Sequence, residues 1–162
     1  MSDVNPSTTQ AFRQLLLQAW QGEVYGVQVF GSLAMRRPDP AEQRKLAVLV
    51  MLEQHVLDLL TPLLLRLVIP LDVADVEAQG ERDTERQHDA QWTSLLRWIS
   101  RDASTALGHY ERLTALVPED DQEAAAVAAV VIEHERALIS FCTKELAGED
   151  DSLADVNRVL TA

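Results

Sequence analysis

The 162-residue sequence contains little cysteine, glycine or proline, and each shortage narrows the possible folds. A single cysteine, Cys142, excludes an intramolecular disulfide and fits a reducing compartment, so we expect a cytoplasmic protein. Six glycines and six prolines are too few for a turn-rich β-protein. Apolar residues make up 47% of the chain, which is too many for a disordered protein. We therefore expect one folded domain spanning residues 1–162.

Basic residues and long apolar runs are also scarce. The 14 Lys and Arg residues are outnumbered by 26 Asp and Glu residues, which gives a formal net charge of −12. An acidic surface repels phosphate groups, so we expect no nucleic-acid partner and no anionic membrane partner. The N-terminal sequence MSDVNPSTTQ is polar and does not resemble a signal peptide. The sequence contains no run of about 18 or more uninterrupted apolar residues, so it does not predict a membrane span.

The segment WQGEVYGVQVFGSL, residues 20–33, has the composition of a strand but the spacing of a helix. Steps of three and four residues continue through it on one stripe: Phe12, Leu15, Leu16, Ala19, Glu23, Val27, Phe30 and Ala34. The spacing predicts a helix that ends at RRPDP, residues 36–40. Asp39 and Pro40 then predict the start of a second helix. This helix is apolar on nearly all sides, which predicts a central position or a homodimer interface.

The second half of the chain predicts two further long helices and a short one. Residues 70–83 show no clear period and are predicted to form a long crossover. Helical spacing covers residues 84 to about 115, and another helix runs from about residue 120 to a C-cap at Gly148. A short amphipathic helix follows at about 151–161. We predict an all-α, up-down-down-up four-helix bundle with its core at about 8–148.

Three polar residues lie within the apolar stripes: Glu23, Glu53 and His134. A buried carboxylate is costly unless it is paired, protonated or bound to a metal, so these positions invite a joint explanation. Each lies about 14 to 16 residues from its hairpin turn, which places all three at a similar depth. On the helix predicted for residues 84–115, Asp102 and His109 flank the corresponding depth.

This layout resembles the ferritin-like superfamily of di-iron and di-manganese carboxylate proteins. The segments GEVYGVQVF and EHERALISFCTKELAG are also similar to uncharacterised bacterial proteins of that superfamily. The resemblance implies a metal site with Glu23, Glu53, His134 and Asp102 as ligands, and iron or manganese as the metal. If the protein is an enzyme, the resemblance implies a metal-dependent oxidoreductase. The sequence departs from the Glu-x-x-His pattern at Val56 and Val131, so the site is reduced in comparison.

Several alternatives stay open at this stage. The same polar residues could form a metal-free hydrogen-bond cluster in a binding or scaffold module. The apolar core could carry an apolar ligand, and a haem-oxygenase-like bundle is the main alternative fold. Gly22 and Gly26 lie on one side of their helix, where they predict either close helix packing or space for a ligand beside Glu23.

Overall fold

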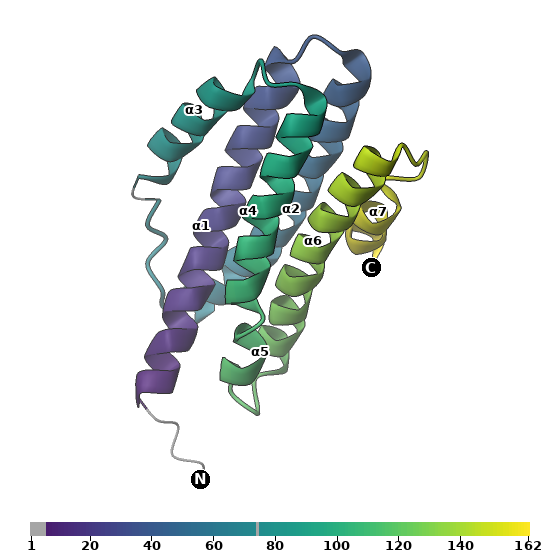
Figure 1. The fold of residues 1–162 in the computed structure, drawn as a ribbon. Helices are drawn as coiled ribbons and strands as arrows, with labels where there is room; N and C mark the ends of the chain where they lie inside the picture. Colours follow the sequence, from purple (N-terminus) through teal and green to yellow (C-terminus); the bar gives the residue numbers. More distant parts are fainter. Residues whose placement is uncertain (1–5, 74) are drawn as a thin grey trace.

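The computed structural model describes residues 6–73 and 75–162, and these residues form an all-α fold without a strand. The helices, listed in chain order, are α1 (Pro6–Arg36), α2 (Pro40–Arg66), α3 (Val76–Gln87), α4 (Trp92–Tyr110), α5 (Leu113–Leu116), α6 (Gln122–Ala147) and α7 (Ala154–Thr161). Figure 1 shows α1, α2, α4 and α6 as the long rods of the molecule, with α3 and α7 outside them.

The first two helices form a tight hairpin, as the sequence predicts. The Asp39 carboxylate accepts hydrogen bonds from the backbone N–H groups of Ala41 at 2.7 Å and Glu42 at 3.4 Å. Pro40 occupies the first turn, where its missing N–H needs no partner. The strand-like segment 20–33 is helical throughout. Its long apolar stripe, which packs against α2, overrides its local β-propensity.

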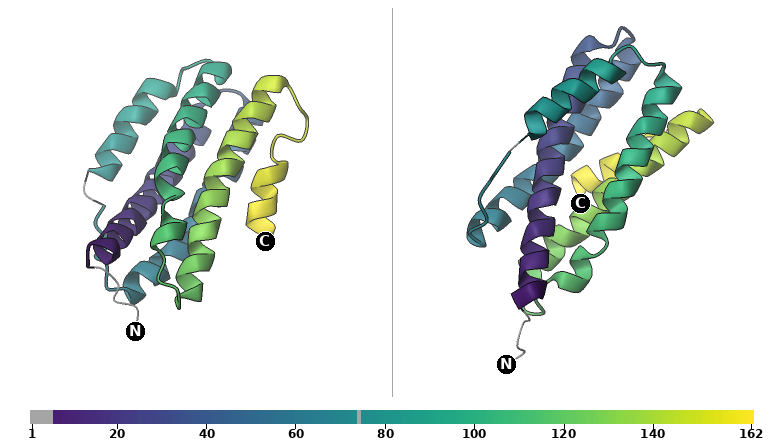
Figure 2. Two further views of the ribbon diagram at one scale, coloured as in Figure 1. Left: turned by 60° about the horizontal axis from the view of Figure 1, so that its bottom comes forward. Right: turned by 60° about the vertical axis from the view of Figure 1, so that its left-hand side comes forward.

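The crossover contains a helix, so the prediction for residues 70–83 is wrong from Val76 onward. The prediction of one helix over residues 84–115 is also wrong, because α3 ends at Gln87 and α4 begins at Trp92. The α3 sequence VEAQGERDTERQ is polar and has no apolar stripe from which a helix could be predicted. It is instead attached to α1 by polar contacts, including a 2.6 Å hydrogen bond from the Tyr25 hydroxyl to Asp83. Figure 2 shows α3 alongside α1.

The C-terminal half folds back through short connections. The short helix α5 leads from α4 toward α6, and α6 ends at Gly148, whose positive φ of 73° suits glycine. The predicted C-cap is therefore confirmed. The N-cap lies at Asp121, whose side chain accepts a hydrogen bond from the Ala124 backbone N–H. The short C-terminal helix is also present as α7, which packs against α6 and α2.

A layer of polar residues separates two groups of buried apolar side chains. One group includes Trp20, Val56 and Ile132 and extends toward the α5 end of the molecule. The other includes Val29, Leu52 and Ala137 and extends toward the α1–α2 turn. On α1, α2 and α6 the stretches between these groups contain Glu23, Glu53, and His134 with Glu135. The sequence positions of the polar residues therefore place them together halfway along the helices.

Within the described residues, α2 is the one helix that is long and apolar enough to cross a membrane by length and composition. In its most apolar window, 39% of the residues are buried inside the protein. Core helices of water-soluble proteins pass the same test. In this structure the buried face of α2 packs against α1 and α6 and includes Glu53.

Candidate metal centre

Glu23, Glu53 and His134 meet in the interior, as their equal depth in the sequence predicts. Their exposed fractions are 1%, 3% and 1%, respectively. One ligand atom from each side chain can be chosen so that all three atoms lie within 4.8 Å of one another. Three helices that are distant in sequence therefore contribute one polar side chain each to a single buried point.

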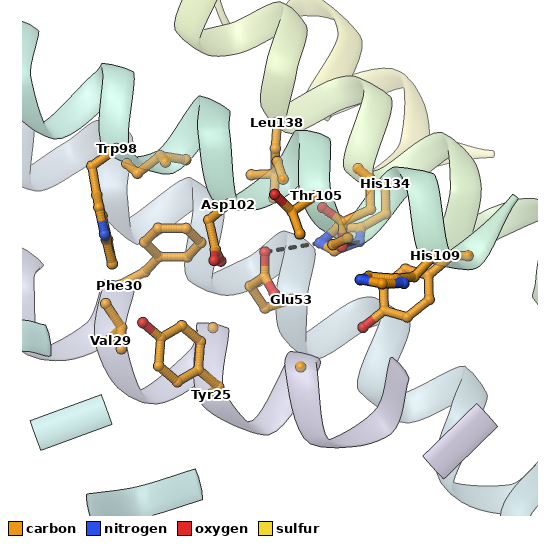
Figure 3. A pocket seen from close by; sticks show the side chains of 17 residues that line it. Tyr25, Val29, Phe30, Glu53, Trp98, Asp102, Thr105, His109, His134 and Leu138 are labelled. Carbon is orange, nitrogen blue, oxygen red and sulfur yellow. Dashed lines mark hydrogen bonds and ion pairs between the residues drawn. The ribbon is translucent and has the colours of Figure 1, made fainter. Parts of the chain in front are cut away.

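The imidazole of His134 lies between the two carboxylates. Its Nε2 is 2.8 Å from Glu53 Oε1, a hydrogen-bond distance, and its Nδ1 is 3.4 Å from Glu23 Oε1. Figure 3 shows the contact between His134 and Glu53 from close by. Two buried atoms, His134 Nδ1 and Glu23 Oε2, have no hydrogen-bond partner among the described residues. Buried polar atoms without partners are rare, and they often mark a site for water or an ion.

Glu135 is a fourth buried acid that the sequence analysis did not select. It is 6% exposed, and its Oε1 lies 3.7 Å from His134 Nδ1. A signal was available in the sequence. Val131, Glu135, Leu138 and Cys142 form a second apolar stripe with steps of four, three and four residues, beside the stripe that contains His134. The buried face of α6 is wider than a single stripe, so two adjacent positions both point inward.

Gly26 creates the space that Glu53 occupies. A Cβ atom at Gly26 would lie 2.1 Å from Glu53 Oε2 and 2.5 Å from its Cδ, distances at which atoms cannot coexist. A Cβ atom at Gly22 would lie 3.0 Å from the Tyr110 hydroxyl. The close approach expected from these two glycines is therefore present, and at Gly26 it serves a carboxylate of the site.

Burial and repulsion between charges favour protons on Glu23 and Glu135. Burial, followed by the charge of Glu53, raises the pKa of Glu23 well above its usual 4.5. Burial also raises the pKa of Glu135 to about 8. For His134, burial acts to lower the pKa, but the charges of Glu53 and Glu135 outweigh it and raise the pKa to about 9. Without a metal, the layer therefore holds a protonated imidazole between carboxyl groups at neutral pH.

Asp102, the fourth predicted ligand, lies near the three-residue group but outside it. Asp102 and His109 are both exposed on α4, and both line a cavity beside the group. Burial of its inner side, followed by the charges of Asp83 and Glu53, raises the pKa of Asp102. Asp102 therefore lies at the mouth of the cavity, on the solvent side of Glu53.

The cavity has a volume of about 240 Å³ and reaches inward to Glu53, His134 and Glu135. In Figure 3, Trp98 and Phe30 lie at one end of it, Asp102 and Glu53 near its middle, and His109 at the other end. The polar layer is thus open to a small molecule or ion from the α4 side.

The donors present suit a divalent metal ion. Two carboxylates and an imidazole match the ligands that iron, manganese and zinc take in proteins. Bonds of about 2.1 Å keep ligand atoms within about 4.2 Å of one another, so the side chains need to close by no more than about 0.6 Å around one ion. The unpartnered atoms Glu23 Oε2 and His134 Nδ1 offer two of the possible contacts. His134 has to lose a proton on binding, because only a neutral imidazole is a ligand.

No family model, no curated protein and no solved structure matches this chain.

Proposed function

We propose that this protein binds one iron or manganese ion through Glu23, Glu53 and His134. The observation that carries the proposal is the convergence of these three side chains at one buried point, together with the unpartnered atoms beside it. A bound ion would offset the repulsion between the carboxylates and would supply Lewis-acid or one-electron chemistry. If the protein is an enzyme, we infer a metal-dependent oxidoreductase.

We also propose a ferritin-like, up-down-down-up bundle as the architecture. The chain path supports this arrangement, because α1 and α6 rise in Figure 1 whereas α2 and α4 descend. The long connection that carries α3 returns the chain to the starting end of α2, so that α4 runs in the same direction as α2. Val56 and Val131 replace the residues that would complete two Glu-x-x-His motifs, which supports a single ion rather than a pair.

The metal content of protein purified without chelators tests the metal proposal. We expect close to one Fe or Mn per chain after loading, and a loss of most of it when Glu23 and Glu53 are both changed to Gln. Glu133→Gln is the control, because Glu133 is exposed on the same helix as His134. Metal below about 0.1 per chain in the wild type, unchanged after adding Fe²⁺ or Mn²⁺, would contradict the proposal.

A metal-free scaffold is the second candidate, and the 2.8 Å contact between His134 and Glu53 favours it. In that case the polar layer is a hydrogen-bond cluster without an ion. The Gln double variant separates the two candidates. Reduced metal binding in a folded variant supports the metal site, whereas the scaffold predicts no metal in either protein.

We further propose that the protein forms a homodimer through α2. Two large apolar side chains of α2, Met51 and Leu65, are each 59% exposed. An apolar groove of about 620 Å³ is lined by Leu59 of α2 together with Val130 and Val159. Sedimentation at micromolar concentration should give a dimer in the wild type and a monomer after Met51→Glu and Leu65→Glu together. A wild-type monomer would contradict this proposal.

A further inference from the structure

The cavity beside the polar layer is lined by acidic and aromatic side chains that the proposed metal site does not use. Its inner wall carries Glu135, which is 94% buried and whose Oε1 lies 3.7 Å from His134 Nδ1. Its mouth carries Asp102. After one ion has been held by Glu23, Glu53 and His134, two carboxylates remain that face the cavity.

The other walls of the cavity are aromatic and apolar. Tyr25, Phe30, Trp98 and Tyr110 all contribute to them, as do Val29 and Leu138. Figure 3 shows the Trp98 and Phe30 rings on one side of Asp102. Aromatic faces attract organic cations, and apolar walls bury a hydrocarbon body. No Lys or Arg lines the cavity, and its three acidic side chains, Glu53, Asp102 and Glu135, outnumber the protonated imidazole of His134.

We propose that this cavity binds a small organic ammonium ion, with its charged nitrogen beside Glu135 and Asp102 and its carbon body against Phe30 and Trp98. A water molecule takes about 30 Å³ in the liquid, so the volume of about 240 Å³ corresponds to roughly eight waters. An amine of five to eight non-hydrogen atoms is therefore the expected size, on the order of benzylamine. The inference goes beyond the metal site, because the cavity and its two acids do not depend on an ion.

Three acidic side chains line the cavity, those of Glu53, Asp102 and Glu135, and this excess of acids explains why a cation, rather than a neutral molecule, is favoured. Removing Glu135 from water is unfavourable, and a positive charge placed beside it recovers much of that free energy. A neutral molecule of the same shape would fill the volume but would bring no positive charge to these acids. An anion would face Glu53, Asp102 and Glu135 together, which is a repulsive arrangement.

Calorimetric titration of chelator-treated protein at pH 8 tests the proposal, with benzylammonium as the probe and benzyl alcohol as its neutral match. We expect benzylammonium to bind with a Kd below about 1 mM and at least tenfold more tightly than the alcohol. Butylammonium should bind as well, because it carries the same positive charge on a smaller hydrocarbon group. Equal affinity for amine and alcohol, or no binding of either amine at 10 mM, roughly −2.7 kcal/mol, would overturn the proposal.

Two variants locate the binding. Glu135→Gln keeps the size of the side chain and should weaken benzylammonium binding at least tenfold. Glu133→Gln removes the same charge two positions away, on the exposed face, and should leave the affinity unchanged. Circular dichroism shows whether each variant is folded. If Glu135→Gln is misfolded, Asp102→Asn at the cavity mouth provides the same test. Unchanged affinity in a folded Glu135→Gln variant would show that the amine binds elsewhere, which would also overturn the proposal.

Discussion

Replacing Gly26 by Ala should separate the helix preference of alanine from the packing of the polar layer. The new Cβ would lie 2.1 Å from Glu53 Oε2 and 2.5 Å from Glu53 Cδ. The Glu53 carboxylate would have to move, and its 2.8 Å contact with His134 would be lost or lengthened. Gly31→Ala is the matched control on the same helix, because its Cβ would meet only Val50 Cγ2, at 4.0 Å.

The two substitutions should have opposite signs. Alanine in a helix interior is more favourable than glycine by about 0.5–1 kcal/mol, and Gly31→Ala should show this gain. At Gly26 the same gain is opposed by the loss of a charged hydrogen bond of about 1.5–3 kcal/mol, or by about 3–5 kcal/mol if the buried pair is broken. We therefore expect Gly26→Ala to lower the free energy of unfolding by about 1–4 kcal/mol.

Urea unfolding measures the stability difference, and titration with Mn²⁺ measures the site. We expect Gly26→Ala to bind metal at least tenfold more weakly than Gly31→Ala, because the new Cβ displaces the Glu53 carboxylate. The reasoning is refuted if Gly26→Ala is as stable as Gly31→Ala and binds metal equally well. That result would mean that Glu53 can leave its present position without consequence.

Four other outcomes follow from the same structure. Burial raises the pKa of Glu135 from 4.5 to about 8, so its contribution to stability is present below pH 4.5 and is lost as the pH rises to 8. The free energy of unfolding, measured with urea, should therefore fall less between pH 4.5 and pH 8 in Glu135→Gln than in the wild type. The pKa of His134 is raised to about 9, so its contribution is present below about pH 6.5 and is lost as the pH rises through 9, and His134→Gln should remove this loss in the same assay. Tyr25→Phe removes a 2.6 Å hydrogen bond to Asp83 and should destabilise the protein by about 1 kcal/mol, with faster amide exchange in α3. Gly148→Ala places a side chain at a φ of 73°, so it should lower the free energy of unfolding by about 1 kcal/mol and with it the melting temperature.

The parts of the fold that the sequence predicted are those where a local signal and a long-range pattern agree. Asp39 and Pro40 mark the start of α2, and both flanking helices carry continuous apolar stripes. Gly148 marks the end of α6 in the same way. At residues 20–33 the two signals disagree, and the stripe determines the structure because burial along a whole helix outweighs local propensity.

The crossover was mispredicted because the contacts that hold α3 do not involve an apolar face. Its attachments include the Tyr25–Asp83 hydrogen bond and a hydrogen bond from Gln28 to the Glu77 carbonyl at 3.0 Å. A Cβ at Gly80 would lie 2.8 Å from Gln28 Oε1, so the glycine allows this close approach. Contacts of this kind depend on where α1 lies in space, and no periodicity in the sequence of α3 indicates them.

The candidate site was predicted as far as single stripes could indicate it. Glu23, Glu53 and His134 interrupt apolar stripes, and they are the residues that the structure brings together. Glu135 was missed because its neighbour His134 already interrupts the first stripe of α6, and a second inward-facing position was not considered. Asp102 was selected by depth along the bundle, but depth does not determine exposure, and its side chain lies at the cavity mouth.

The metal and the amine can be told apart because they use different acids of one layer. A ligand that binds only the native state raises its stability, so each should raise the melting temperature as its concentration increases. Glu23 does not line the cavity, so Glu23→Gln should abolish the shift with Mn²⁺ and keep the shift with benzylammonium. Glu135→Gln should need at least tenfold more benzylammonium for the same shift and should keep most of the Mn²⁺ shift. If either substitution abolished both shifts in a folded protein, the two ligands would share one site, and the amine would no longer be independent of the metal centre.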